Sequence, residues 1–183
     1  ACATPTIAPT LAPTPAIKPT TQPTAQSAQP PNNLTIQPTP NVEVFVKGLD
    51  TPWAIDFAPD GRIFLTERLG NVRVIKDGKL QAEPWMKIAV AEVGEGGLLG
   101  LALDPQFAQN RFVYVAYTYR ADNGRLQNRL VRLREENGKG ALDKILLDGA
   151  NGNSNHDGGR VKFGPDGKLY WTVGDAGNQS QAQ

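Results

Sequence analysis

The chain has 183 residues, a formal net charge of +1, one cysteine and one histidine. The balanced charge argues against a nucleic-acid surface, the single cysteine excludes an intrachain disulfide, and the single histidine excludes a multi-histidine metal centre within this chain. No apolar run approaches the roughly 18 residues that a membrane-spanning helix needs.

The first part of the chain has a composition of its own. Ten of the 15 prolines lie in residues 1–40, and all 19 glycines follow them. A segment with so much proline and so few large apolar side chains cannot bury enough surface to offset its ordering entropy. We therefore expect a disordered Pro/Thr-rich tether over residues 1–41, partly extended as polyproline II, and a globular domain over residues 42–183.

Cys2 stands at the head of this tether. Bacterial lipoproteins have this order of lipid-carrying cysteine, flexible tether and domain, and Thr/Pro-rich stalks are typical of exported proteins. The sequence thus favours an exported protein, periplasmic or on the cell surface, with a lipid anchor at Cys2 as its only membrane contact. The alternative is an unmodified thiol near a frayed terminus.

The globular part begins as a series of short strands. Val42, Val44 and Val46 recur every second residue, a spacing typical of a strand. More strands are expected at residues 53–57, 62–66 and 71–76. Asp60-Gly61 predicts a turn between the first two of these strands, and Asp77-Gly78 predicts a turn after the third, because Asp-Gly suits turns with positive φ.

This unit of strand, turn and strand recurs along the chain. The middle copy spans residues 97–120 with its turn at Asp104, a strand at Leu130 to Arg134 follows it, and the last copy spans residues 158–178. Recurrence every 45 to 60 residues or so, with no convincing helix longer than about ten residues, indicates propeller blades. A β-sandwich would explain the strands but not the repeated hairpin. We expect an all-β fold holding about two and a half to three blades of a larger propeller.

The only histidine lies in a polar, glycine-rich loop before one of these strands. His156 is placed to face the central channel, where propellers bind ligands, and an imidazole is a natural general base near neutral pH. Asp175, at the far end of the adjacent predicted strand, could orient that imidazole. The alternatives are a solvated histidine and an aspartate that caps a turn.

A second candidate loop surrounds Glu95. Gly94, Gly96 and Gly97 would let the backbone approach a ligand closely. No helix follows this loop, so it is no dinucleotide-binding fingerprint. The alternative is a blade-entry loop with Glu95 in solvent. No metal-ligating set is evident in the chain.

Three motifs, at residues 48–68, 94–118 and 155–175, together resemble the glucose/sorbosone dehydrogenase family. The resemblance covers about residues 42–183, and its most informative part is His-x-Gly-Gly-Arg followed by the Pro-Asp-Gly hairpin and Gly-Asp. It implies a six-bladed propeller that binds pyrroloquinoline quinone (PQQ) with calcium. It further implies oxidation of the anomeric hydroxyl of an aldose sugar to a lactone, with hydride transfer to the quinone.

The resemblance also assigns site residues. His156 falls on the family's general base and Asp175 on the acid that orients it. Glu95 and Asn155 fall on positions beside the cofactor and substrate, where some members have glutamine and aspartate. The calcium ligands and the remaining cofactor ligands are expected downstream of residue 183, so this chain is expected to be inactive alone. The alternative function is a non-enzymatic exported propeller that binds carbohydrate or a protein partner. The sugar and the electron acceptor stay open.

Overall fold

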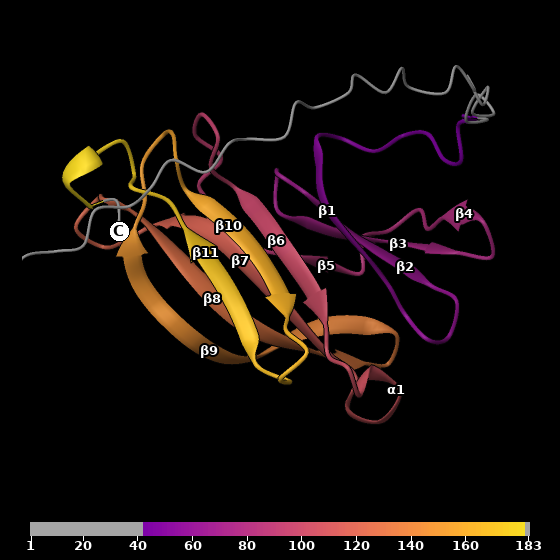
Figure 1. Cartoon of the computed structure of the whole chain (residues 1–183). Coiled ribbons are helices and arrows are strands. Elements are labelled where there is room, and N and C mark those ends of the chain that lie inside the picture. Colours follow the sequence, from indigo (N-terminus) through magenta and orange to yellow (C-terminus); the bar gives the residue numbers. More distant parts are fainter. Residues whose placement is uncertain (1–41, 182–183) are drawn as a thin grey trace, which may run out of the picture. The chain divides into compact units, whose positions relative to one another are not determined.

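The computed structural model describes residues 42–181, which form three antiparallel sheets (Figure 1). Helical structure in this part of the chain is limited to α1 (Phe107–Asn110) and the 3-10 turn η1 (Gln179–Gln181). None of its helices is long and apolar enough to cross a membrane. The tether of residues 1–41 and the anchor at Cys2 lie outside the described residues and stay predictions.

The first sheet follows the predicted strands closely. Its strands are β1 (Pro52–Phe57), β2 (Ile63–Glu67), β3 (Asn71–Lys76), β4 (Lys79–Leu80) and β5 (Met86–Lys87). They pair in the order β1-β2-β3-β4, and β5 also pairs with β3. Gly61 and Gly78 have φ of 86° and 71°. Both turns therefore favour glycine, which has no Cβ to clash with the backbone at positive φ.

The second sheet is larger than the sequence predicted. It comprises β6 (Leu98–Leu103), β7 (Phe112–Arg120), β8 (Leu126–Glu136) and β9 (Lys139–Asn151), paired in that order. The strand expected at residues 130–134 extends to 126–136, and the sequence did not reveal β9 at all. Most residues of β9 are exposed or half-buried, and its pairing with β8 shifts register three times, so it lacks an apolar alternation.

The third sheet is a hairpin of β10 (Gly158–Phe163) and β11 (Leu169–Val173), closed by the predicted turn at residues 164–167. The inner strands β1, β6 and β10 lie side by side (Figure 1). Each breaks its pairing register near its first residues, between Pro52 and Ala54, Leu98 and Leu101, and Gly158 and Val161. The repeated geometry confirms the prediction of an all-β fold that forms part of a propeller.

Close contacts join successive inner strands. The backbone N–H of Leu103 on β6 donates to Asp56 Oδ2 on β1 over 2.8 Å. On its other side β6 meets β10 at Gly100, where an added Cβ would lie 1.9 Å from the carbonyl oxygen of Gly159. Glycine is therefore required at position 100 for the two strands to approach.

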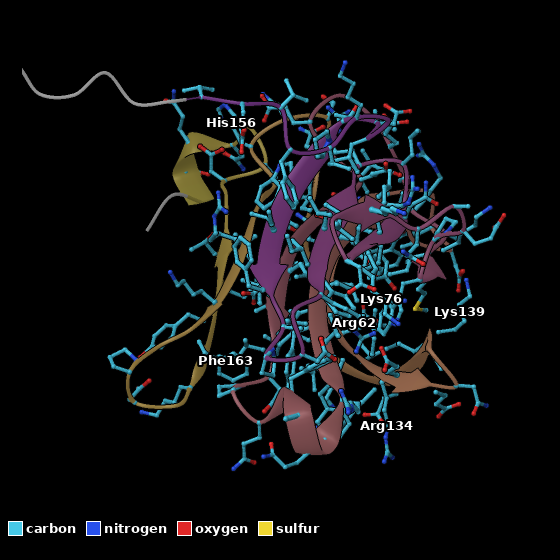
Figure 2. All side chains as sticks on the ribbon, turned by 90° about the vertical axis from the view of Figure 1, so that its right-hand side faces the viewer. Arg62, Lys76, Arg134, Lys139, His156 and Phe163 are labelled. Carbon is cyan, nitrogen blue, oxygen red and sulfur yellow. The ribbon has the colours of Figure 1, made fainter. Side chains whose placement is uncertain are left out.

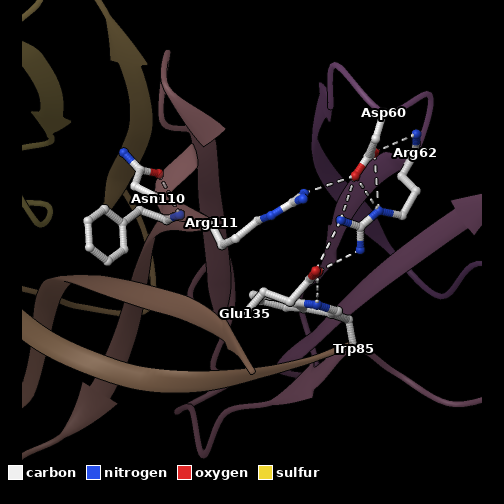
Figure 3. Close-up of polar contacts among 7 residues, drawn as sticks. Asp60, Arg62, Trp85, Asn110, Arg111 and Glu135 are labelled. Atoms are coloured by element: carbon white, nitrogen blue, oxygen red, sulfur yellow. Dashed lines mark hydrogen bonds and ion pairs between the residues drawn. The ribbon is translucent and has the colours of Figure 1, made fainter. Parts of the chain in front are cut away.

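The core between the first two sheets combines an aromatic cluster with an ion cluster. Phe64 packs edge to face on Trp85 and Phe107, with ring centroids 5.3 and 5.6 Å away. Beside it, the Arg62 guanidinium binds Asp60 in its own turn and Glu135 on β8 (Figure 3). This ion cluster couples the first sheet to the second.

The segment before β1 departs from the prediction. Val42 and Val44 lie in irregular backbone, with 86% and 72% of their surface exposed. A two-residue spacing produces a strand only where another strand offers hydrogen bonds, and none of the described strands pairs with this segment. The strand expectation for residues 42–46 is therefore wrong for the structure described.

Candidate functional site

The candidate site lies where the inner strands β6 and β10 begin. The loop of residues 152–157 enters β10, and the glycine-rich loop of residues 94–97 enters β6. Figure 2 shows His156 at one end of the sheets and Phe163, the last residue of β10, toward the other. The same view places Arg62 and Lys139 well away from His156, so the ion cluster between the first two sheets is separate from this site.

The structure brings His156 and Asp175 into contact. His156 Nδ1 lies 2.8 Å from Asp175 Oδ1, which also accepts the backbone N–H of Gly177 over 2.9 Å. The hydrogen bond from His156, together with that from Gly177, lowers the pKa of Asp175, so this group is a carboxylate at neutral pH. A carboxylate can only accept here, which assigns the proton to Nδ1 and leaves Nε2 as the basic ring nitrogen.

His156 has an uncommon backbone conformation, with φ of 58°. Two hydrogen bonds hold it, because its N–H donates to Glu95 Oε2 over 2.9 Å and its carbonyl accepts from Ala176 over 3.2 Å. Gly174 passes so close that an added Cβ would lie 1.9 Å from the His156 carbonyl oxygen. Strained residues of this kind persist only where the surroundings fix them.

The glycine-rich loop docks directly on the histidine loop. Glu95 N donates to the Ser154 carbonyl over 2.8 Å, and an added Cβ at Gly94 would lie 2.0 Å from that same oxygen. Glu95 is exposed overall, but one of its carboxylate oxygens is occupied by the His156 N–H. The sequence predicted Glu95 near a ligand, and the structure gives it a direct contact with the candidate base.

Asn155 is half-buried beside the same loop cluster. Its side-chain oxygen lies 2.9 Å from the point where a Cβ on Gly177 would stand, so a larger residue at position 177 would displace the Asn155 amide. The four residues singled out from the sequence, Glu95, Asn155, His156 and Asp175, thus gather at one end of the sheets although they come from three loops.

The structure adds a residue that the sequence did not reveal. Asp157 is buried, with 2% of its surface exposed, although it follows the exposed His156 directly. Its Oδ1 accepts hydrogen bonds from Asn153 N and Asn128 Nδ2. In the motif His-x-Gly-Gly-Arg, Asp157 stands at the unspecified position x. Nothing in the sequence predicted its contact with Asn128, 29 residues earlier.

A hollow of about 360 Å³ opens beside these loops, and we call it the mouth hollow. It is lined by Trp53, Arg68, Glu95, Asp157 and Gly158. The Arg68 guanidinium donates to the Gly94 carbonyl over 2.6 Å, which braces the glycine-rich loop. Within residues 42–181, no three His, Cys, Asp or Glu side chains cluster as metal ligands would.

Comparison with known proteins gives the family. A family model described as Glucose / Sorbosone dehydrogenase matches residues 49–183. Quinoprotein glucose dehydrogenase B of Acinetobacter calcoaceticus is 30% identical over 152 residues, which make up 76% of this chain and 32% of that protein. The PQQ-bound structure of aldose sugar dehydrogenase from Streptomyces coelicolor is 30% identical with a TM-score of 0.68, over 76% of this chain and 42% of that one.

One similar protein is named for an interaction and not for a dehydrogenase activity. The mouse Hedgehog-interacting protein is 29% identical over 153 residues, which make up 73% of this chain and 22% of that protein. The chain spans less than half of the length of each of these three proteins.

Proposed function

Because this chain belongs to the glucose/sorbosone dehydrogenase family, we propose that the full-length protein oxidises the anomeric hydroxyl of aldose sugars to lactones. The names of two relatives, a quinoprotein glucose dehydrogenase and a PQQ-bound aldose sugar dehydrogenase, support PQQ as the hydride acceptor. The observation that carries the proposal is the contact of His156 Nδ1 with Asp175 Oδ1 at 2.8 Å.

His156 is the proposed general base. Oxidation of a hemiacetal requires removal of the proton from its anomeric oxygen while hydride leaves the same carbon. Nε2 of His156 takes that proton, and the ionised Asp175 stabilises the imidazolium that results. Asp175 also fixes the ring, since the hydrogen bond at Nδ1 excludes the tautomer in which Nε2 would carry the proton at rest.

The described residues fit one side of a cofactor site. The mouth hollow lies beside the His156 loop and is lined in part by Asp157, whose buried Oδ2 has no hydrogen-bond partner within residues 42–181. Glu95 and Asn155 would border the bound PQQ, whose quinone supplies the two-electron acceptor for the hydride. Of the side chains lining the hollow, only Arg68 is a cation. We therefore propose that residues downstream of 183 would hold the calcium ion and supply the further cations that anionic PQQ would require.

The test uses the full-length protein loaded with PQQ and Ca²⁺, and dye reduction with glucose or arabinose. His156→Ala should lower kcat by at least about 100-fold, because general-base catalysis typically contributes that much. The melting temperature should stay unchanged, since the His156 side chain is 58% exposed. Quinone-dependent turnover that survives in His156→Ala would refute the role of this residue.

A second candidate is a propeller that binds a carbohydrate or a protein partner without catalysis. The similarity to the Hedgehog-interacting protein favours it, since that name describes binding to a protein. The same assay separates the two, because a binding protein given PQQ and Ca²⁺ reduces no dye with any aldose.

A further inference from the structure

Asp157 is the buried neighbour of the candidate base. Its carboxyl points away from solvent, whereas His156 before it and Gly158 after it are exposed. Oδ1 accepts the backbone N–H of Asn153 over 2.9 Å and the Asn128 amide over 3.1 Å. One carboxyl oxygen therefore ties the start of the histidine loop to its end and to a strand of the second sheet.

The connection continues into the sheet. Asn128 on β8 donates a second hydrogen bond to the Asn151 carbonyl over 2.8 Å and accepts one from the Thr118 hydroxyl on β7 over 2.7 Å. Asn128 and Thr118 are 2% and 0% exposed. The groups that join Asp157 Oδ1, Asn128 and Thr118 are all hydrogen-bonded, and this part of the network is rigid because a different arrangement would leave one of them without a partner. The histidine loop is thereby anchored to the interior of the second sheet.

The surroundings of the other carboxyl oxygen, Oδ2, disfavour the charged form of Asp157. Oδ2 has no partner within residues 42–181, and it lies 3.2 Å from where a Cβ on Gly96 would stand. Burial raises the pKa of Asp157 against the opposing effect of its hydrogen bonds, and the charge of Glu95 raises it further. The charged form of Asp157 is thus less favoured than that of an exposed aspartate, and Oδ1 needs no charge to accept its two hydrogen bonds.

We propose that Asp157 is a positioning residue for His156, with Oδ1 holding the loop of residues 153–157 on Asn128 so that the imidazole stays against Asp175. The proposal rests on the proposed function for its kinetic consequence only. Glu95, in the glycine-rich loop, accepts the His156 N–H. Asp157 Oδ1 holds the start of the histidine loop by accepting the Asn153 N–H. These contacts matter because the left-handed backbone at His156, with φ of 58°, is costly and persists only where its surroundings fix it.

The experiment compares Asp157→Ala, which deletes both oxygens, with Asp157→Asn, which keeps an oxygen where Oδ1 stands. Asp166→Ala is the matched control, since Asp166 is an exposed aspartate in the turn of the same hairpin. All are made in the full-length protein with PQQ and Ca²⁺. The two readouts are steady-state kinetics and hydrogen exchange of peptides covering residues 151–158, and the second does not depend on activity.

We expect Asp157→Ala to lower kcat about 30-fold with KM within about threefold, because small misplacement of a catalytic group costs up to about 100-fold. Exchange in residues 151–158 should rise in this variant alone. Asp157→Asn and Asp166→Ala should stay within about threefold of wild type in kcat. If Asp157→Ala does not fold, Thr118→Val takes its place, with an expected loss of about three- to tenfold from the weakened network.

Two results would overturn the proposal. One is wild-type kcat in a folded Asp157→Ala or, in its place, Thr118→Val. The other is an Asp157→Asn as slow as Asp157→Ala, which would show that a charge is required rather than an acceptor. Absence of sugar oxidation in the wild type would refute the proposed function instead, and the exchange measurement would still decide whether Asp157 holds the loop.

Discussion

The backbone N–H of His156 donates a 2.9 Å hydrogen bond to the carboxylate of Glu95, which comes from the loop that enters a different sheet. The candidate base of the third sheet is therefore positioned by the entry loop of the second. Because β6 and β10 pack against each other through Gly100 and Gly159, this contact joins loops whose strands are already fixed.

The Glu95 contact predicts a difference between two substitutions. Glu95→Gln keeps an oxygen for the His156 N–H and removes a negative charge beside the proposed anionic cofactor, so PQQ should bind several-fold more tightly. Glu95→Ala removes the acceptor and should lower kcat by about tenfold, the order expected for a loosened catalytic group. Fluorescence titration of the calcium-loaded full-length protein with PQQ and steady-state kinetics measure the two effects. Wild-type kcat in Glu95→Ala would contradict the positioning role.

The Asp175 contact predicts a loss of rate with little loss of binding. Asp175→Asn fills the same space but can donate to Nδ1, which favours the tautomer with the proton on Nε2. We expect kcat to fall by about 100-fold or more, since mispositioned tautomers cost up to about 10,000-fold where a base depends on its carboxylate. Sugar KM and the PQQ affinity should change by less than about threefold. An Asp175→Asn variant that keeps more than half of its kcat would show that Asp175 only caps its turn.

The pairing of Asp175 with His156 was predictable because it depends on turns and strands that are close together in the sequence. The Asp60-Gly61 and Asp166-Gly167 turns fix where strands reverse, and the reversal at Gly167 brings Asp175 back to the loop of His156. The contacts that cross between sheets were not predictable, since the bonds of Glu95 to His156 and Asn128 to Asp157 depend on how blades pack.

The same distinction explains the two places where the strands predicted from the sequence differ from the structure. The strand β9 (Lys139–Asn151) forms because β8 offers it a ladder, although its own residues are mostly exposed and show no alternation. Residues 42–46 show the opposite case, with an alternation that no described strand pairs with. A strand therefore depends on its neighbour as much as on its own pattern.

The ion cluster between the first two sheets predicts a large effect on stability. The Arg62 side chain is 14% exposed and bridges Asp60 and Glu135, the latter at 2.5 Å. Arg62→Met would remove the cation that faces Glu135 and would leave Asp60 with Arg111, 3.3 Å away, at a cost of about 2–4 kcal/mol in the free energy of unfolding. Urea unfolding of the full-length protein measures it. Adding Glu135→Gln should recover part of the loss, whereas Arg125→Met, on an exposed turn, should change stability by less than about 0.5 kcal/mol.

The burial of Asp157 predicts how stability depends on pH. Burial raises the pKa of this carboxyl in the folded protein above its value in the unfolded chain, with a further contribution from the charge of Glu95. The folded state therefore binds this proton more tightly, and the resulting stability is fully present below the ordinary pKa of an aspartate. It is lost as the pH rises through the higher pKa of the folded state.

Asp157→Asn cannot ionise, so it should not show this loss. We expect the free energy of unfolding of Asp157→Asn, measured relative to wild type, to rise as the pH increases above about 4, the ordinary aspartate value. Urea unfolding at several pH values between acid and mildly alkaline conditions measures the difference, in which the titration of other groups cancels. Glu95 and Arg68 are the other charged side chains of the mouth hollow, so Glu95→Gln should shrink the pH-dependent difference by removing the neighbouring charge. A difference between Asp157→Asn and wild type that stays constant over this range would mean that Asp157 is ionised in the folded protein.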